Sequence, residues 1–238
     1  MCFFFRNMLE SHNGGCMELL QQGLITLNFC QEEIPSIQEK LEGYIRELML
    51  FNSAYDLVGA DNKEQIVVNH ILDSLSAWHY IKELAQEREA GGKQVQIADI
   101  GSGGGLPGIP LAIALPQFQF VLVERMSKRC AFLENCAAVL GLRNVRVENL
   151  QAEQVEAGSF DVATFRAFRP LDKKMIRTLL RTIKQDGILA AYKAKLESIE
   201  SEMAAITSIV PDYKIKPLEV PFLEDRQRHL VLIRAEGW

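Results

Sequence analysis

The fold is decided by residues 97–108, which read Ile97-Ala98-Asp99-Ile100-Gly101-Ser102-Gly103-Gly104-Gly105-Leu106-Pro107-Gly108. The first four residues suit a buried β-strand, and the glycines suit a turn that opens a helix. Such a turn lets the backbone approach a ligand closely, and the helix that follows offers free N–H groups. Residues 103–108 also match GxGxxG, the pattern of dinucleotide-binding loops. The stretch therefore predicts a nucleotide site on a Rossmann-like fold, and the neighbouring residues must indicate the ligand.

Side chains around this loop favour S-adenosylmethionine over a dinucleotide. Pro107 and Pro110 remove N–H donors where a pyrophosphate would need them. Asp99 would repel phosphate but attract an ammonium group, and Glu124, which ends the next strand, can accept both ribose hydroxyls of an adenosine. An amino acid joined to adenosine through a positive sulfonium fits these residues. A dinucleotide and a purely structural glycine turn remain alternatives.

From residue 95 onward, strand-like and helix-like segments alternate. This alternation predicts right-handed crossovers and a mostly parallel sheet with helices on both faces. The last two strands should pair antiparallel, because residues 221–227 leave no room for a crossover helix. This α/β pattern is that of Rossmann-like class I S-adenosylmethionine-dependent methyltransferases. The expected strands are Val95–Ile100, Gln119–Glu124, Val145–Asn149, Phe160–Phe165, Gly187–Tyr192, Tyr213–Val220 and His229–Arg234, and the expected helices are Gly108–Leu115, Lys128–Leu140 and Asp172–Lys184.

The N-terminal third of the chain has helical periodicity instead. Apolar residues recur every three or four positions over Glu32–Asn52 and again over Lys63–Glu87. Ala90-Gly91-Gly92 then separates these helices from the alternating region. We therefore expect three parts, which are a poorly structured lead-in over residues 1–16, an N-terminal helical cap over 17–92 and a methyltransferase domain over 93–238.

Composition and charge narrow the class of protein. The 238 residues include 26 basic and 31 acidic ones, and the net charge of −5 excludes a globally basic nucleic-acid coat but not a local RNA-binding face. The five cysteines are scattered, and the four histidines lack ligand spacing, so we expect neither a disulfide framework nor a metal site. No apolar run has the length of an export signal or a membrane span. We expect a cytoplasmic monomer with no membrane partner.

Positive charge gathers in residues 161–195. This segment has nine basic and three acidic residues, a net charge of +6 in a chain whose total is −5. Four of the basic residues have helical spacing and would form one stripe, which is either an RNA contact or an ordinary solvated face. These four are Lys173, Arg177, Arg181 and Lys184. Three others are stronger RNA candidates, because they follow predicted strands at the edge where open parallel sheets bind ligands. These three are Arg166, Lys193 and Lys195.

Two motifs carry a family resemblance. Asn69-His70-Ile71-Leu72-Asp73-Ser74, together with the glycine loop extended through Ile109-Pro110-Leu111, resembles the glucose-inhibited-division B family of bacterial 16S rRNA guanine-N7 methyltransferases. Phe165-Arg166-Ala167-Phe168 and Arg228-His229-Leu230-Val231 support the likeness, which covers about residues 19–234. The resemblance implies S-adenosyl-L-methionine as methyl donor. It implies 16S rRNA as partner, in the small ribosomal subunit or its assembly intermediate.

The resemblance also implies a donor site. The glycine loop would lie against the methionine part, the residues after the second strand around the ribose and adenine, and those after the third strand against the adenine. The implied cofactor-binding residues are Asp99, Gly101, Gly103, Gly105, Leu106, Glu124, Arg125, Met126, Ala152, Glu153 and Arg166.

Methylation of guanine N7 needs no general base, because N7 carries a lone pair and no proton. We therefore expect catalysis by positioning, with no proton-transferring residue. Arg166 would hold guanine O6, a phosphate or the donor carboxylate, with a structural salt bridge as the alternative, and Phe165 or Phe168 would stack on a flipped base. His70 and Asp73, three apart, would form a hydrogen-bonded brace or a surface helix pair. The expected substrate-binding residues are Arg166, Phe168, Lys193, Lys195, Arg228 and His229.

Three rival functions fit parts of the sequence. A small-molecule methyltransferase on the same fold would not depend on ribosomal RNA. A non-catalytic rRNA-binding assembly factor would bind RNA without turning over the donor, although the intact Asp99, glycine loop and Glu124 argue against it. An NAD-dependent oxidoreductase would bind NADH in preference to S-adenosylmethionine.

Overall fold

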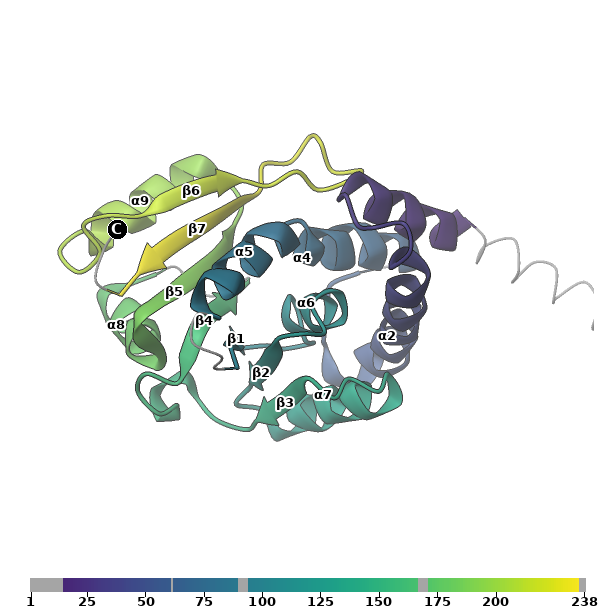
Figure 1. The fold of residues 1–238 in the computed structure, drawn as a ribbon, viewed down its shortest axis with the longest axis horizontal. Helices are drawn as coiled ribbons and strands as arrows, with labels where there is room; N and C mark the ends of the chain where they lie inside the picture. The colour runs from purple at the N-terminus through teal and green to yellow at the C-terminus, as the bar shows by residue number, and fades with distance from the viewer. Residues whose placement is uncertain (1–14, 61, 90–93, 167–170, 236–238) are drawn as a thin grey trace, which may run out of the picture.

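The computed structural model describes residues 15–60, 62–89, 94–166 and 171–235, and its centre is a seven-stranded sheet of order β3-β2-β1-β4-β5-β7-β6 (Figure 1). Strands β1 to β5 run parallel, and β7 lies antiparallel between β5 and β6, so the predicted sheet is confirmed. The strand order reverses between β1 and β4, and open α/β sheets bind ligands at such a point. The strands are Gln96–Ile100 (β1), Gln119–Val123 (β2), Val145–Glu148 (β3), Phe160–Phe165 (β4), Ile183–Lys193 (β5), Lys214–Pro217 (β6) and His229–Arg234 (β7).

Helices cover both faces of the sheet (Figure 1). In β2, Phe120 and Leu122 point into the cores beneath α5, α6 and α7, whereas Val121 and Val123 point into the core beneath α8 and α9. Strands buried on both faces are continuous apolar runs, which is why the sequence indicated them clearly. The helices are Trp78–Arg88 (α5), Gly108–Ala114 (α6), Ser127–Val139 (α7), Lys173–Thr182 (α8) and Leu196–Ile206 (α9), with the short 3₁₀ turn Ala152–Gln154 (η2) after β3.

The N-terminal helices pack on the outside of α6 and α7 (Figure 1). Residues 15–26 are helical, and α2 spans Ile34–Tyr55. Tyr44 of α2, Ile109 of α6 and Phe132 of α7 are buried in one hydrophobic cluster. The Tyr44 hydroxyl also donates a hydrogen bond to the carbonyl oxygen of Gly104. The helical segment therefore packs against the glycine loop through a shared hydrophobic core and one hydrogen bond.

The prediction of a single helix over Lys63–Glu87 is wrong. The structure divides it into α3 (Lys63–Ile66), the π-helix η1 (Val67–Leu72), α4 (Asp73–Leu75) and α5. Two hydroxyls explain the interruption, because Ser74 Oγ donates to the His70 carbonyl oxygen at 2.6 Å and Ser76 Oγ donates to that of Asp73 at 2.8 Å. Such side-chain bonds compete with the regular backbone ladder of a helix.

Two further expectations are corrected in the C-terminal half. Helix α8 ends at Thr182, whose hydroxyl donates to the Leu179 carbonyl oxygen, and β5 begins before the expected Gly187. Lys184 consequently lies in a strand and not on the predicted helical stripe. Helix α9 has no counterpart among the predicted helices, although its buried residues have helical spacing.

Candidate functional site

A buried carboxylate holds the glycine loop at the end of β1. Asp99 is 1% exposed, and its Oδ2 accepts hydrogen bonds from Ser102 Oγ at 2.7 Å and from the Gly108 backbone nitrogen at 2.9 Å. A Cβ atom on Gly108 would lie 2.7 Å from this Oδ2 and 2.4 Å from Leu122 Cδ2. Only glycine therefore lets the start of α6 approach β1 and β2 so closely. The carboxylate joins the two ends of the loop.

The second oxygen of Asp99 has no such support. Oδ1 is buried and receives no hydrogen bond from any described residue. Burial raises the pKa of Asp99 to about 6, against the opposing effect of the bonds from Ser102 and Gly108 and of the nearby Arg166. A buried acceptor without a partner is destabilising. A cationic hydrogen-bond donor brought to this point would relieve it.

Glu124, which follows β2, ties the loop to the next strand. It is 4% exposed, with Oε2 accepting from the Gly103 backbone nitrogen at 2.9 Å and Oε1 from that of Met126 at 2.8 Å. Gly103 has a φ of 58°, a conformation that glycine adopts without strain. Each carboxylate oxygen can accept a further bond. Glu124 can therefore hold the loop and still accept from the hydroxyls of a ligand.

A cavity of about 390 Å³, here called the first cavity, opens beside Glu124. Its volume lies in the range of small-ligand pockets. Met175 of α8 lines it together with five of the predicted donor-binding residues, which are Gly101, Glu124, Arg125, Ala152 and Glu153. The other predicted donor-binding residues are not in its wall. These are Asp99, Gly103, Gly105 and Leu106 in or under the loop, Met126 exposed beside it, and Arg166, which lines a second cavity.

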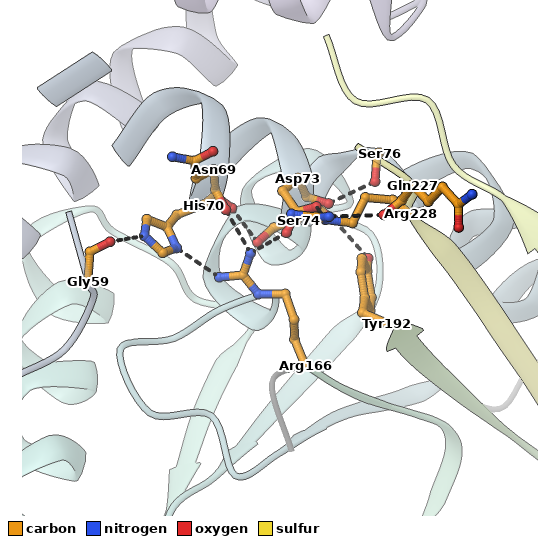
Figure 2. A network of polar contacts seen from close by, with 10 residues as sticks. All are labelled: Gly59, Asn69, His70, Asp73, Ser74, Ser76, Arg166, Tyr192, Gln227 and Arg228. Carbon is orange, nitrogen blue, oxygen red and sulfur yellow. Dashed lines mark hydrogen bonds and ion pairs between the residues drawn. The ribbon is translucent and has the colours of Figure 1, made fainter. Parts of the chain in front are cut away.

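The second cavity, of about 520 Å³, lies at the carboxyl ends of β4 and β5 and has a charged wall. Figure 2 shows a network of polar contacts that includes part of its wall. Oδ2 of Asp73 lies 2.7 Å from Nη1 of Arg166, and Oδ1 lies 2.8 Å from Nε of Arg228. All three side chains are mostly buried. One carboxylate therefore joins α4, the end of β4 and the start of β7.

His70 contacts the other side of Arg166 (Figure 2). Its Nδ1 lies 3.3 Å from Nη2 of Arg166, and its Nε2 lies 3.3 Å from the Gly59 carbonyl oxygen. A guanidinium can only donate, so Nδ1 accepts and Nε2 carries the proton. Burial lowers the pKa of His70, and the positive charge of Arg166 lowers it further. A neutral His70 and an ionised Asp73 thus brace the helical segment against the end of β4.

The guanidinium of Arg166 has N–H groups that make no hydrogen bond to the described residues. Nη1 donates to the Asn69 carbonyl oxygen at 3.2 Å and to Asp73, and Nη2 donates to His70. A guanidinium has five N–H groups, so the Nε–H and one Nη2–H are not used by the described residues. Because Arg166 lines the second cavity, these groups can serve an acceptor there.

Other predicted substrate-binding residues are engaged within the protein or lie elsewhere. Nζ of Lys193 pairs with Oε2 of Glu202 at 2.6 Å, and Nδ1 of His229 lies 2.6 Å from a backbone carbonyl oxygen. Lys195 is exposed in the wall of the second cavity. Phe168 lies outside the described residues.

Sequence reasoning missed several residues in the wall of the second cavity, among them the polar residues Asn69, Tyr192 and Glu202. The buried Tyr192 donates from its hydroxyl to the Ser74 carbonyl oxygen at 2.8 Å. Asn69 lies in a motif that carried the family resemblance, and Tyr192 ends a predicted strand, so both had a signal. Glu202 had none, because it lies on the unpredicted α9.

The described ranges contain no cluster of three or more His, Cys, Asp or Glu side chains arranged to hold a metal ion. Across the same ranges, no helix combines the length and the apolar character that a bilayer crossing requires.

Proteins with similar sequences are ribosomal RNA methyltransferases. Residues 37–231 match the sequence pattern of the family described as rRNA small subunit methyltransferase G, GidB. The chain is 38% identical over 237 residues to ribosomal RNA small subunit methyltransferase G of Treponema denticola, with 90% of this chain and 93% of the relative covered. It is 35% identical over 196 residues to the protein of the same name from Neisseria gonorrhoeae, with 82% and 88% covered.

Solved structures share the fold at low sequence identity. A S-adenosylmethionine-dependent O-methyltransferase from Thermotoga maritima has a TM-score of 0.51 at 12% identity, covering 80% of this chain and 71% of that one. The human methyltransferase 10 domain containing protein has a TM-score of 0.52 at 11% identity, covering 82% and 98%. At these identities the likeness concerns the fold alone, which is that of class I methyltransferases, as predicted.

Proposed function

The chain belongs to the rRNA small subunit methyltransferase G family, and from this premise we propose that it transfers the methyl group of S-adenosylmethionine to N7 of a guanine in 16S ribosomal RNA. The observation that carries the proposal is the pair of cavities at the carboxyl edge of the sheet, one beside Glu124 and one beside Arg166. The first cavity reaches the end of β1 and the second the end of β4, and these strands are neighbours. A methyl donor and an acceptor base need two sites arranged in this way.

The residues of the first cavity suit S-adenosylmethionine. Glu124 would accept from the ribose hydroxyls, Ala152 and Glu153 would contact the adenine, and the loop at Gly101 would carry the methionine part. Oδ1 of Asp99, which is buried and has no hydrogen-bond partner among the described residues, would accept from the ammonium group directly or through one water molecule. The bound donor would supply a methyl group on a positively charged sulfur.

The residues of the second cavity suit guanine. The unused N–H groups of Arg166 would donate to O6, the oxygen next to N7 on the same edge of the base. Adenine has an amino group at this position, which is a donor, so the contact would select guanine. Asp73 and Glu202 pair with three of the cations in the wall, which lowers the positive charge that a methylated base would meet.

The chemistry requires positioning and no proton transfer. N7 has a lone pair in the plane of the base, so no group of the protein has to remove a proton. The neutral His70 and the ionised Asp73 would act on the reaction only through the orientation of Arg166. We also propose that the enzyme acts as a monomer in the cytoplasm, where it would meet ribosomal RNA.

The proposal is tested by mapping N7-methylguanine in 16S rRNA from cells with and without the gene. A guanine that loses its N7 methyl group in the deletion strain, and regains it when purified protein and S-adenosylmethionine are added to the small subunits, is the expected result. Identical N7 methylation in both strains would contradict the proposal. Methyl transfer to free metabolites without RNA would favour a small-molecule enzyme, and RNA binding without donor turnover would favour an assembly factor.

A further inference from the structure

The basic residues predicted on one stripe of α8 fall into two groups in the structure. Nη2 of Arg181 donates to the carbonyl oxygens of Glu153 and Val155 at 2.9 and 2.6 Å. Nζ of Lys184 lies 2.7 Å from Oδ1 of Asp161. These two cations stabilise the fold, and their internal partners explain their positions without a ligand.

The basic residues in the first two turns of α8 differ from these. Lys173, Lys174 and Arg177 are exposed, and none of them pairs with a carboxylate in the part of the chain that the structure describes. The neighbouring acid, Asp172, is occupied as the helix cap, because its Oδ1 accepts from the Met175 backbone nitrogen at 2.7 Å. Three like charges thus lie close together on one helix, next to the single acid Asp172 and without an ion pair of their own among the described residues.

Helix α8 begins between the two cavities. The backbone nitrogen of Leu171, just before the helix, donates to Oε2 of Glu202 in the second cavity at 3.0 Å. Met175, in the first turn, lines the first cavity. Lys173 and Lys174 lie between these two anchors, within about one helical turn, ~5.4 Å, of each along the helix axis. A polymer that reached the second cavity from the side of α8 would therefore come near them.

We propose that Lys173, Lys174 and Arg177 bind phosphates of the rRNA strand that delivers the acceptor base to the second cavity. Unpaired cations in a chain of net charge −5 attract a polyanion to this face in preference to the rest of the surface. The inference rests on the proposed function, which makes RNA the substrate. Of the predicted basic stripe, Lys173 and Arg177 would then bind RNA, whereas Arg181 and Lys184 stabilise the fold.

The test measures how binding to unmethylated small ribosomal subunits depends on KCl concentration. Each phosphate contact contributes about 0.7–0.9 to the slope of log affinity against log salt. The full-length triple variant K173Q/K174Q/R177Q should therefore lower the slope by roughly two to three and weaken binding, with the affinity for S-adenosylmethionine unchanged. R177Q and R143Q are the matched single variants. Arg143 is also exposed, but it lies at the amino end of β3, whereas the two cavities lie at the carboxyl ends of the strands. R177Q should lower the slope by about one, and R143Q should leave it unchanged.

A second control separates binding from folding. R181Q removes two internal hydrogen bonds, so it should lower the melting temperature without changing the salt slope. A wild-type slope in the triple variant, with the wild-type protein methylating the rRNA, would overturn this inference and leave the proposed function standing. A wild-type protein that methylates no rRNA would contradict the proposed function, and this inference with it.

Discussion

Oδ2 of Asp73 lies 2.7 Å from Nη1 of Arg166, and this ion pair connects the start of α4 to the end of β4. The other oxygen of the same carboxylate binds Arg228, so one acid pairs with two arginines from distant parts of the chain. The pair fixes the guanidinium that we assign to the acceptor base.

Replacing Asp73 with alanine should lower the free energy of unfolding by about 3 kcal/mol, because it leaves two mostly buried arginines without a counter-charge. Asp73→Asn should cost less, since the amide oxygen can still accept one hydrogen bond. Urea denaturation measures both, with Glu200→Gln on the exposed side of α9 as control. If Asp73→Ala unfolds at the same urea concentration as this control, the ion pairs do not stabilise the fold.

Donor affinity should depend on pH through Asp99. The pKa of this carboxyl is raised to about 6, so it is ionised at pH 7.5 and mostly protonated at pH 5.5, where it no longer attracts an ammonium group. Titration calorimetry with S-adenosylmethionine should show the Kd rising about fourfold between these pH values. Asp99→Asn should bind weakly at both. If the wild-type Kd is the same at pH 7.5 and 5.5, the charge of Asp99 does not contribute to donor binding.

His70 should make the fold less stable in acid. Its pKa is lowered in the folded protein, so the unfolded chain binds the proton more readily, and stability falls as the pH drops below the ordinary histidine value of 6.5. His70→Gln should therefore lose less stability than the wild type between pH 7 and 5, measured by urea denaturation at each pH. Asp99 titrates in both proteins, so the difference between them isolates His70. Parallel curves would show that His70 is not held neutral.

Arg166→Lys should impair RNA methylation but not donor binding. Lysine keeps a positive charge near Asp73 but lacks the planar fork that can reach guanine O6 and Asp73 together. We expect kcat/KM for small subunits to fall about 10- to 100-fold, as for the loss of a base-specific contact of ~1–3 kcal/mol. The Kd for S-adenosylmethionine should stay within about twofold. A large rise in that Kd would instead assign Arg166 to the donor carboxylate.

Gly108→Ala should destabilise the protein and distort the donor site. The added Cβ would meet Leu122 Cδ2 at 2.4 Å and Oδ2 of Asp99 at 2.7 Å, and overpacking of this kind costs about 1–3 kcal/mol. Gly59→Ala is the matched control, because a Cβ there meets nothing within 4 Å. Thermal unfolding and donor titration of the two variants should diverge, and equal values would mean that the start of α6 can shift without consequence.

The elements predictable from the sequence were those whose signal is local. Strand β2 is apolar from Phe120 to Val123, and Glu124 could be placed near the glycine loop because the carboxyl ends of parallel strands meet at one edge. The π-helix η1 was not predictable, since its apolar spacing is also that of an α-helix. A π-helix is distinguished by backbone hydrogen bonds between residues five apart, and the spacing of side chains does not reveal these.

The charged partners in the site depend on contacts that periodicity does not encode. Arg228 and Asp73 are 155 residues apart, and nothing in either neighbourhood indicates the other. Lys193 could be placed at a strand end, but its pairing with Glu202 follows from the unpredicted α9. The sequence thus indicated which residues gather at the carboxyl edge, whereas their pairing followed only from the packing of distant elements.

The π-helix also makes the site sensitive to chain length. Each residue in a helix turns the following ones by about 100°, and a π-turn accommodates one residue more than an α-turn does. Shortening Val67–Leu72 by one residue removes this extra residue and leaves Asp73 directed at both of its arginines, whereas lengthening the segment by one residue would rotate Asp73 away from them by about 100°. Most substitutions in η1 alter one contact, whereas an insertion there would displace every charged group that follows on the same helix. In homologous chains, this segment should lose a residue more readily than it gains one.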